Sequence, residues 1–167
     1  MSDAGQPKST GRAAAPDMAV MAGPVAELVA GAKPVVIPET RGFWEGTAKE
    51  ELRVQRCANG HLQLPGGPCC RVCLSPELTW EAASGRGSIF SFTVVHHALH
   101  PQFMAQIPYV LADVQLEEGP ILTSNVTGVA PDQVTIGMPV EVWFDEGGFD
   151  AFGTPFRLPK FRPAGGG

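Results

Sequence analysis

The chain has 167 residues, enough for one domain or two small ones, and 44% of them are hydrophobic, so a buried core can form. A formal net charge of −5 argues against a nucleic-acid partner, because binding to phosphates depends on clustered Lys and Arg. No run of about 18 apolar residues predicts a membrane span, and no basic flank followed by a sustained apolar run predicts a signal peptide.

The N-terminal residues 1–34 are rich in Ala, Gly, Pro and Ser. Segments of this composition bury little apolar surface, so we predict a disordered arm over 1–34. Within it, the short run 25–29 is expected to form a helical turn only when it docks on a partner.

A helical pattern replaces this composition from Thr40 onwards. Thr40 is a suitable helix cap, and Phe43, Trp44 and Leu52 are among the apolar residues that recur at helical spacing. We predict a helical segment over 35–51 in which the two aromatic residues anchor the helix by packing. The alternative is that they dock on another subunit.

The rest of the chain predicts strands and turns. Proline interrupts 152–161, which predicts a last strand confined to an edge. Several strands within about 80 residues cannot bury both faces of an open sheet, so we expect closure into a five-stranded OB-type barrel over 83–163, with a tail at 164–167. The predicted strands are 52–57, 78–82, 88–97, 109–116, 121–126 and 140–144, followed by 152–161.

All four cysteines lie within 57–73, together with one histidine. A disulfide scaffold would scatter its cysteines to connect distant segments. Clustering in a chain without an export signal favours metal binding in a reducing, cytoplasmic compartment.

The spacing of these residues predicts a zinc ribbon over 52–82. Cys70 and Cys73 form one Cys-x2-Cys knuckle, and Cys57 with His61 forms the other, because Gly60 stands where a second cysteine would be. Four protein ligands leave no open position, so the predicted zinc is structural, one per chain. Cys69 is the competing fourth ligand, and loss of the metal site is a further alternative.

Ordered motifs over 40–163 resemble a known family. They include Phe43-Trp44-Glu45-Gly46, Leu64-Pro65, Cys70-x2-Cys73, the run 84–96 and the closing run 158–163. Together they resemble the zinc-ribbon plus OB-fold accessory proteins found beside thiolases and related acyl-CoA enzymes, a domain of unknown function of the thirty-five type. The chain departs from the family pattern at Gly60, where a second cysteine is usual.

This resemblance implies a mainly β fold with an N-terminal helical segment, a rubredoxin-like zinc ribbon and a C-terminal OB-fold barrel. It also implies a non-catalytic subunit in a hetero-oligomer with a thiolase-like or aldolase-like acyl-CoA enzyme, one that performs acyl transfer, thiolysis or condensation, or retro-aldol cleavage. Acyl-CoA itself is a possible ligand of the barrel. The alternatives are a stand-alone acyl-CoA-binding module and, less favoured, a single-stranded nucleic-acid-binding OB protein.

No catalytic residue is predicted in the chain. A thiolase-type reaction needs a free cysteine nucleophile and a histidine base, but the predicted zinc takes three of the four cysteines. His96, His97 and His100 follow a strand, and neighbouring residues of a strand point to opposite faces. We expect these histidines to form a polar loop at the rim of the barrel, with His96 the best placed of them for a substrate or interface contact.

Overall fold

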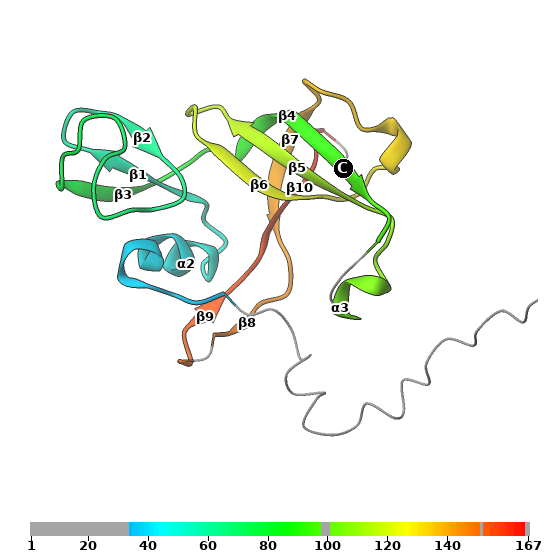
Figure 1. Ribbon diagram of the computed structural model, residues 1–167, viewed down its shortest axis with the longest axis horizontal. Coiled ribbons are helices and arrows are strands. Elements are labelled where there is room, and N and C mark those ends of the chain that lie inside the picture. The colour runs from blue at the N-terminus through cyan, green and yellow to red at the C-terminus, as the bar shows by residue number, and fades with distance from the viewer. Residues whose placement is uncertain (1–33, 98–100, 151, 166–167) are drawn as a thin grey trace, which may run out of the picture. The chain divides into compact units, whose positions relative to one another are not determined.

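The structure is a computed structural model that describes residues 34–97, 101–150 and 152–165. Figure 1 shows a mainly β chain in which a short helix, a small three-stranded sheet and a five-stranded barrel follow one another along the sequence. The predicted arm lies outside the described residues except for Pro34, and the expected helical turn at 25–29 and His100 lie outside them as well.

The predicted helix is present but shorter than 35–51. A 3-10 turn, η2 (Pro38–Thr40), leads into α2 (Arg41–Thr47). Thr40 occupies the cap position without making a side-chain cap bond, because its hydroxyl donates to the carbonyl of Ile37 instead (3.3 Å). The helix ends at Thr47, and three residues later Glu50 adopts a left-handed backbone, φ 60°, in the turn before the first strand.

The three-stranded sheet has β1 (Arg53–Cys57) between β2 (Leu62–Gln63) and β3 (Leu78–Ala82), all antiparallel. The indole of Trp80 on β3 fixes α2 to this sheet. A Cβ at Gly42 would lie 2.2 Å from Cδ1 of that indole, so only glycine permits the close approach.

Five strands close the barrel in the order β10-β6-β5-β4-β7, which confirms the predicted OB-type fold. The barrel strands are β4 (Arg86–Val95), β5 (Tyr109–Leu116), β6 (Ile121–Val126), β7 (Pro139–Phe144) and β10 (Pro159–Pro163); between them lie α3 (Pro101–Met104), η3 (Pro131–Gln133), β8 (Gly148–Phe149) and β9 (Pro155–Phe156).

The prediction that the last strand is confined to an edge was wrong. β10 closes the barrel, since Phe161 pairs with Val142 of β7 on one side and with Val126 of β6 on the other. The prolines do not prevent this, because Pro159 and Pro163 stand at the two ends of β10 and leave the strand interior free to pair.

A bulge in β4 changes the face on which its aromatic residues lie. The pairing with β5 shifts between Ile89 and Ser91, so Phe90 is the extra residue. Phe90 is 56% exposed, whereas Phe92 packs against the core. Strict alternation along the strand would have placed both rings on one face, and the bulge separates them.

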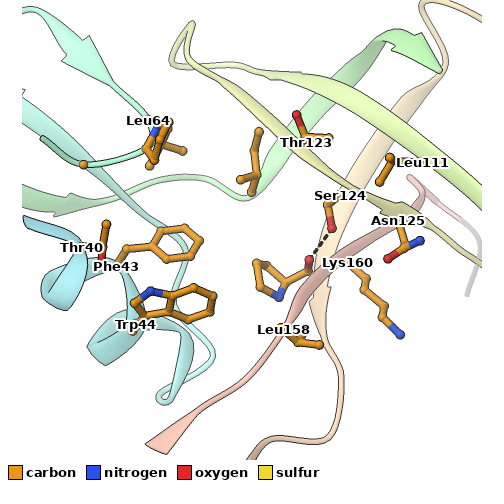
Figure 2. Close-up of a pocket in the computed structure, with 14 residues that line it drawn as sticks. Thr40, Phe43, Trp44, Leu64, Leu111, Thr123, Ser124, Asn125, Leu158 and Lys160 are labelled. Atoms are coloured by element: carbon orange, nitrogen blue, oxygen red, sulfur yellow. Dashed lines mark hydrogen bonds between the residues drawn. The ribbon is translucent and has the colours of Figure 1, made fainter. Parts of the chain in front are cut away.

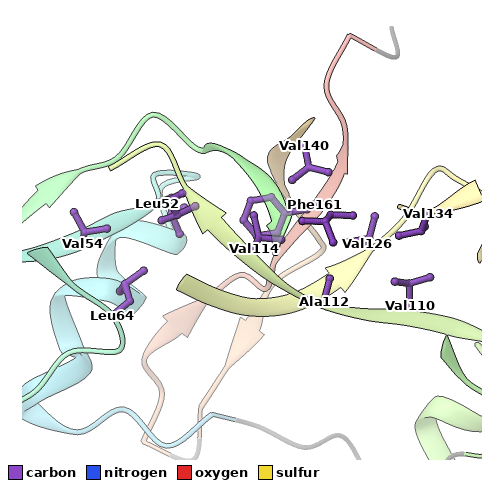
Figure 3. Close-up of a cluster of buried hydrophobic side chains, with 12 residues drawn as sticks. Leu52, Val54, Leu64, Val110, Ala112, Val114, Val126, Val134, Val140 and Phe161 are labelled. Carbon is purple, nitrogen blue, oxygen red and sulfur yellow. The ribbon is translucent and has the colours of Figure 1, made fainter. Parts of the chain in front are cut away.

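One cluster of buried apolar side chains runs through the barrel and the small sheet (Figure 3). Phe161 lies in it with no exposed surface. Val54 of β1 belongs to the same cluster, together with Leu52 just before β1 and Leu64 just after β2. The two β elements are therefore joined by continuous packing.

No helix in the described part of the chain is long and apolar enough to cross a bilayer.

Replacement of Phe161 by alanine is expected to lower the free energy of unfolding by about 3–5 kcal/mol, because a large cavity opens at the centre of the barrel. Phe152→Ala is the matched control, since Phe152 is 78% exposed and its truncation should change stability by less than about 0.5 kcal/mol. Denaturant unfolding measures both. Equal losses in the two variants would contradict the assigned core.

Candidate metal centre

A tight turn brings Cys57 and His61 together. Cys57 is the last residue of β1, and His61 immediately precedes β2. The N–H of Gly60 donates to the carbonyl of Cys57 (2.8 Å), and the N–H of Cys57 donates to the carbonyl of His61 (3.0 Å). Gly60 has φ 83°, a conformation that glycine adopts without strain. The turn therefore explains how a histidine four residues after Cys57 can act beside it.

The four predicted ligands converge on one point. Their donor atoms, one from each of Cys57, His61, Cys70 and Cys73, all lie within 4.8 Å of one another. Sγ of Cys57 is 3.8 Å from Sγ of Cys73 and 3.4 Å from Nδ1 of His61. Nδ1 of His61 is also 3.7 Å from Sγ of Cys70.

These separations fit a zinc ion. With Zn–S bonds of about 2.3 Å, the corners of a tetrahedron lie about 3.8 Å apart. Three sulfurs and one imidazole nitrogen are a usual donor set for structural zinc. The cluster is thus consistent with one structural zinc ion, and no fifth protein group is needed.

Cys69 is not among the four residues whose donor atoms converge. All four cysteines are free of disulfide bonds, and Cys69 is half-buried. Its backbone contributes instead, because its carbonyl accepts a hydrogen bond from Nε2 of Gln63 (3.2 Å).

The environment shifts the pKa values of two thiols in opposite directions. The side-chain amide of Asn59 donates to Sγ of Cys73 (3.3 Å) and, with the backbone N–H of Ser75, lowers the pKa of Cys73 to about 6. Burial raises the pKa of Cys57, although the backbone N–H groups of His61 and Asn59 oppose that rise. A metal ion therefore meets one thiolate that forms readily and must displace a proton from the other, which makes binding dependent on pH.

Two buried glutamines hold the knuckle formed by Cys70 and Cys73 in place, and neither was predicted from the sequence. Gln55 and Gln63 face each other across β1 and β2, with Nε2 of Gln63 donating to Oε1 of Gln55 (2.8 Å). The N–H of Gly67 donates to Oε1 of Gln55 (3.0 Å), and the N–H of Arg71 donates to Oε1 of Gln63 (2.9 Å). These bonds position the loop that carries Cys70. Nothing in the sequence indicates that the side chains of these two polar residues face each other across neighbouring strands.

An apolar groove of about 370 Å³ lies between α2, the loop after β2 and one face of the barrel (Figure 2). Phe43 and Trp44 line it from α2, with ring centroids 5.1 Å apart. Its polar groups are occupied: the hydroxyl of Ser124 donates to the carbonyl of Pro159 (2.5 Å), and Lys160 pairs with Asp145. The groove can hold an apolar group and offers little to anchor a charged one.

His96 and His97, the two predicted rim histidines that the structure describes, are not among the four residues of the metal cluster. His96 and His97 are exposed and directly follow β4.

Two family models match consecutive parts of the chain. Residues 44–79 match the model described as "ChsH2, rubredoxin-like zinc ribbon domain", and residues 80–145 match "ChsH2, C-terminal OB-fold domain". The first match contains β1, β2 and the cysteine cluster and ends inside β3, and the second contains β4 to β7 of the barrel.

Two curated relatives are similar over most of the described chain. The "Probable enoyl-CoA hydratase alpha subunit" of Thermomonospora curvata is 41% identical over 131 residues, which is 77% of this chain and 39% of that protein. The chain thus spans less than half the length of that relative. The "DUF35 domain-containing scaffold protein" of Pyrococcus furiosus is 38% identical over 108 residues, 61% of this chain and 79% of that protein.

A chain of the solved structure described as "Ltp2-ChsH2(DUF35) aldolase" is similar as well. It has a TM-score of 0.68 and 39% sequence identity, and the match covers 79% of this chain and 99% of that one. The chain therefore belongs to the DUF35 family, with a ChsH2-type zinc ribbon followed by an OB-fold domain.

Proposed function

We propose that this chain is a non-catalytic subunit that binds and supports an acyl-CoA enzyme in a hetero-oligomer. The observation that carries the proposal is the similarity, over nearly the whole of the solved chain, to a component of an aldolase. Names of relatives that include an alpha subunit and a scaffold protein support the same role.

The partner is proposed to be thiolase-like or aldolase-like. Its reaction would be acyl transfer, thiolysis or condensation, or retro-aldol cleavage of an acyl-CoA. A free thiolate beside a histidine base would have to come from that partner, because three of the four cysteines here belong to the metal cluster.

The proposed metal ligands are Cys57, His61, Cys70 and Cys73, holding one structural zinc ion. Their convergence and their donor chemistry support this set. The zinc supplies no chemistry to substrate in this proposal; it fixes the two knuckles relative to each other. A reducing cytoplasm would keep the four free thiols available for this role.

A second candidate function is a stand-alone acyl-CoA-binding module. The apolar groove beside Phe43 and Trp44 favours it, since its walls suit an acyl chain. Titration of the isolated chain with an acyl-CoA and, separately, with free CoA distinguishes the candidates. Saturable binding of the acyl-CoA, without binding of free CoA, would favour the stand-alone acyl-CoA-binding module.

Purified protein is expected to contain about one zinc per chain, as measured by plasma mass spectrometry. His61→Ala and Cys70→Ser should reduce the bound zinc, because each removes one of four ligands. Cys69→Ser is the matched control and should retain it, since Cys69 lies next to the cluster without joining it. Loss of zinc in the Cys69 variant alone would refute the ligand set.

Asn59→Ala is expected to raise the pKa of Cys73 in zinc-free protein, because the mutation removes the amide that stabilises the thiolate. The thiolate would then form at higher pH, and the midpoint of the pH profile for alkylation of Cys73 should move upward. Peptide mass spectrometry can follow Cys73 alone. An unchanged midpoint would show that the amide does not stabilise that thiolate.

Co-expression with a thiolase-like or aldolase-like protein from the same organism is expected to yield a stable complex that elutes as one species. The activity should depend on both chains, because the partner supplies the catalytic groups and this subunit supports them. Separate elution, with full activity in the partner alone, would rule the proposal out.

A further inference from the structure

The knuckle formed by Cys70 and Cys73 carries three exposed apolar residues, which we call the knuckle tip: Val72, Leu74 and Pro76. Val72 is 69% exposed and Leu74 is 71% exposed, and Pro76 is exposed as well. Single exposed apolar side chains are common on protein surfaces. Three exposed apolar side chains at alternate positions of one short loop are more than scattered single exposure explains. They indicate a contact surface.

Leu74 is held in a strained backbone conformation. Its φ is 60°, and among the described non-glycine residues only Glu50 shares a positive φ. This region is costly for a residue with a Cβ, whereas glycine adopts it freely. The knuckle would therefore fold more easily with glycine at position 74. An exposed leucine kept in a strained backbone points to a role for its side chain outside the fold.

The knuckle presents this side chain rigidly. The N–H of Leu74 donates to the carbonyl of Cys70 (2.9 Å), and the N–H of Cys70 donates to the carbonyl of Ser75 (2.8 Å). The N–H of Val72 also donates to Sγ of Cys70 (3.4 Å). Because these bonds fix the loop in advance, docking through the tip would cost little conformational entropy.

The charge of the segment also fits an interface. Residues 57–76 contain no Asp, Glu or Lys and one Arg, although the whole chain has a net charge of −5. The centres of protein interfaces show this depletion, with Arg retained. Arg71 is exposed, and its guanidinium donates to the carbonyls of Leu64 (3.2 Å) and Pro65 (3.3 Å), so a fixed positive charge stands beside the tip.

We infer that the knuckle tip docks into an apolar surface, rimmed by carboxylates, on the partner enzyme subunit. The apolar centre would cover Val72, Leu74 and Pro76, and a rim carboxylate would face Arg71. This inference rests on the proposed function and adds to it the part of the chain that the partner recognises.

Leu74→Gly separates docking from folding, because it relieves strain while it removes the exposed side chain. Glu50→Gly is the matched control: it relieves the same strain at φ 60° away from the knuckle. Glu50 has an exposed ion pair with Arg157 (3.5 Å), and pairs of this kind contribute little to stability. Val72→Ser provides a third variant that removes a tip side chain without altering the backbone preference at position 74.

The measurement is the Kd for a purified thiolase-like or aldolase-like partner protein from the same organism, by biolayer interferometry with the whole chain of 167 residues. Both glycine variants should keep their zinc, and Tm should hold or rise by up to about 4 °C. Leu74→Gly is expected to raise Kd about tenfold or more, and Val72→Ser should raise Kd in the same direction. Glu50→Gly should leave Kd unchanged.

Three results would overturn the inference. If the unaltered chain binds and both tip variants bind equally well, the tip is not the docking site, while the proposed function stands. If the unaltered chain forms no complex, the proposed function and the inference fail together. If sedimentation of the chain alone shows a dimer that Leu74→Gly dissociates, the tip binds a second copy rather than the enzyme.

Discussion

The convergence of three sulfurs and one imidazole on a single point is the constraint on which the rest of the structure depends. The small sheet has three strands, one of them only two residues long. An element of this size buries too little apolar surface to be stable by itself. The free energy of metal binding adds directly to the free energy of folding. The metal ligands link the end of β1 to the knuckle formed by Cys70 and Cys73.

The sheet transmits this rigidity to the barrel by packing. Leu52, Val54 and Leu64 belong to the same buried cluster as Phe161 at the centre of the barrel. Trp80 fixes α2 against the sheet, and Trp44 of α2 packs on Phe156 of β9, with ring centroids 5.9 Å apart. The metal site, the helix and the barrel are thus connected by direct packing, as the proposed role of a docking subunit would require.

Spacing and periodicity were enough to predict the parts of the fold that depend on local chemistry. The strand bounds 78–82, 109–116 and 121–126 were predicted to the residue, because turn signals flank them. Closure into a barrel was predicted, but the pairing of particular distant strands was not. The closure by β10 depends on pairing with β6 and β7, and the bulge at Phe90 depends on the register with β5. The candidate site divides in the same way, since ligand spacing is local, whereas the Gln55–Gln63 contact and the backbone strain at Leu74 arise only on folding.

The ligand set can be read directly from X-ray absorption at the zinc edge. Purified protein should show three sulfur atoms at about 2.3 Å and one nitrogen at about 2.0–2.1 Å, as expected for three thiolates and His61. A shell of four sulfurs would mean that Cys69 replaces the histidine. That shell, or the absence of a zinc edge, would contradict the account of how this chain is held together.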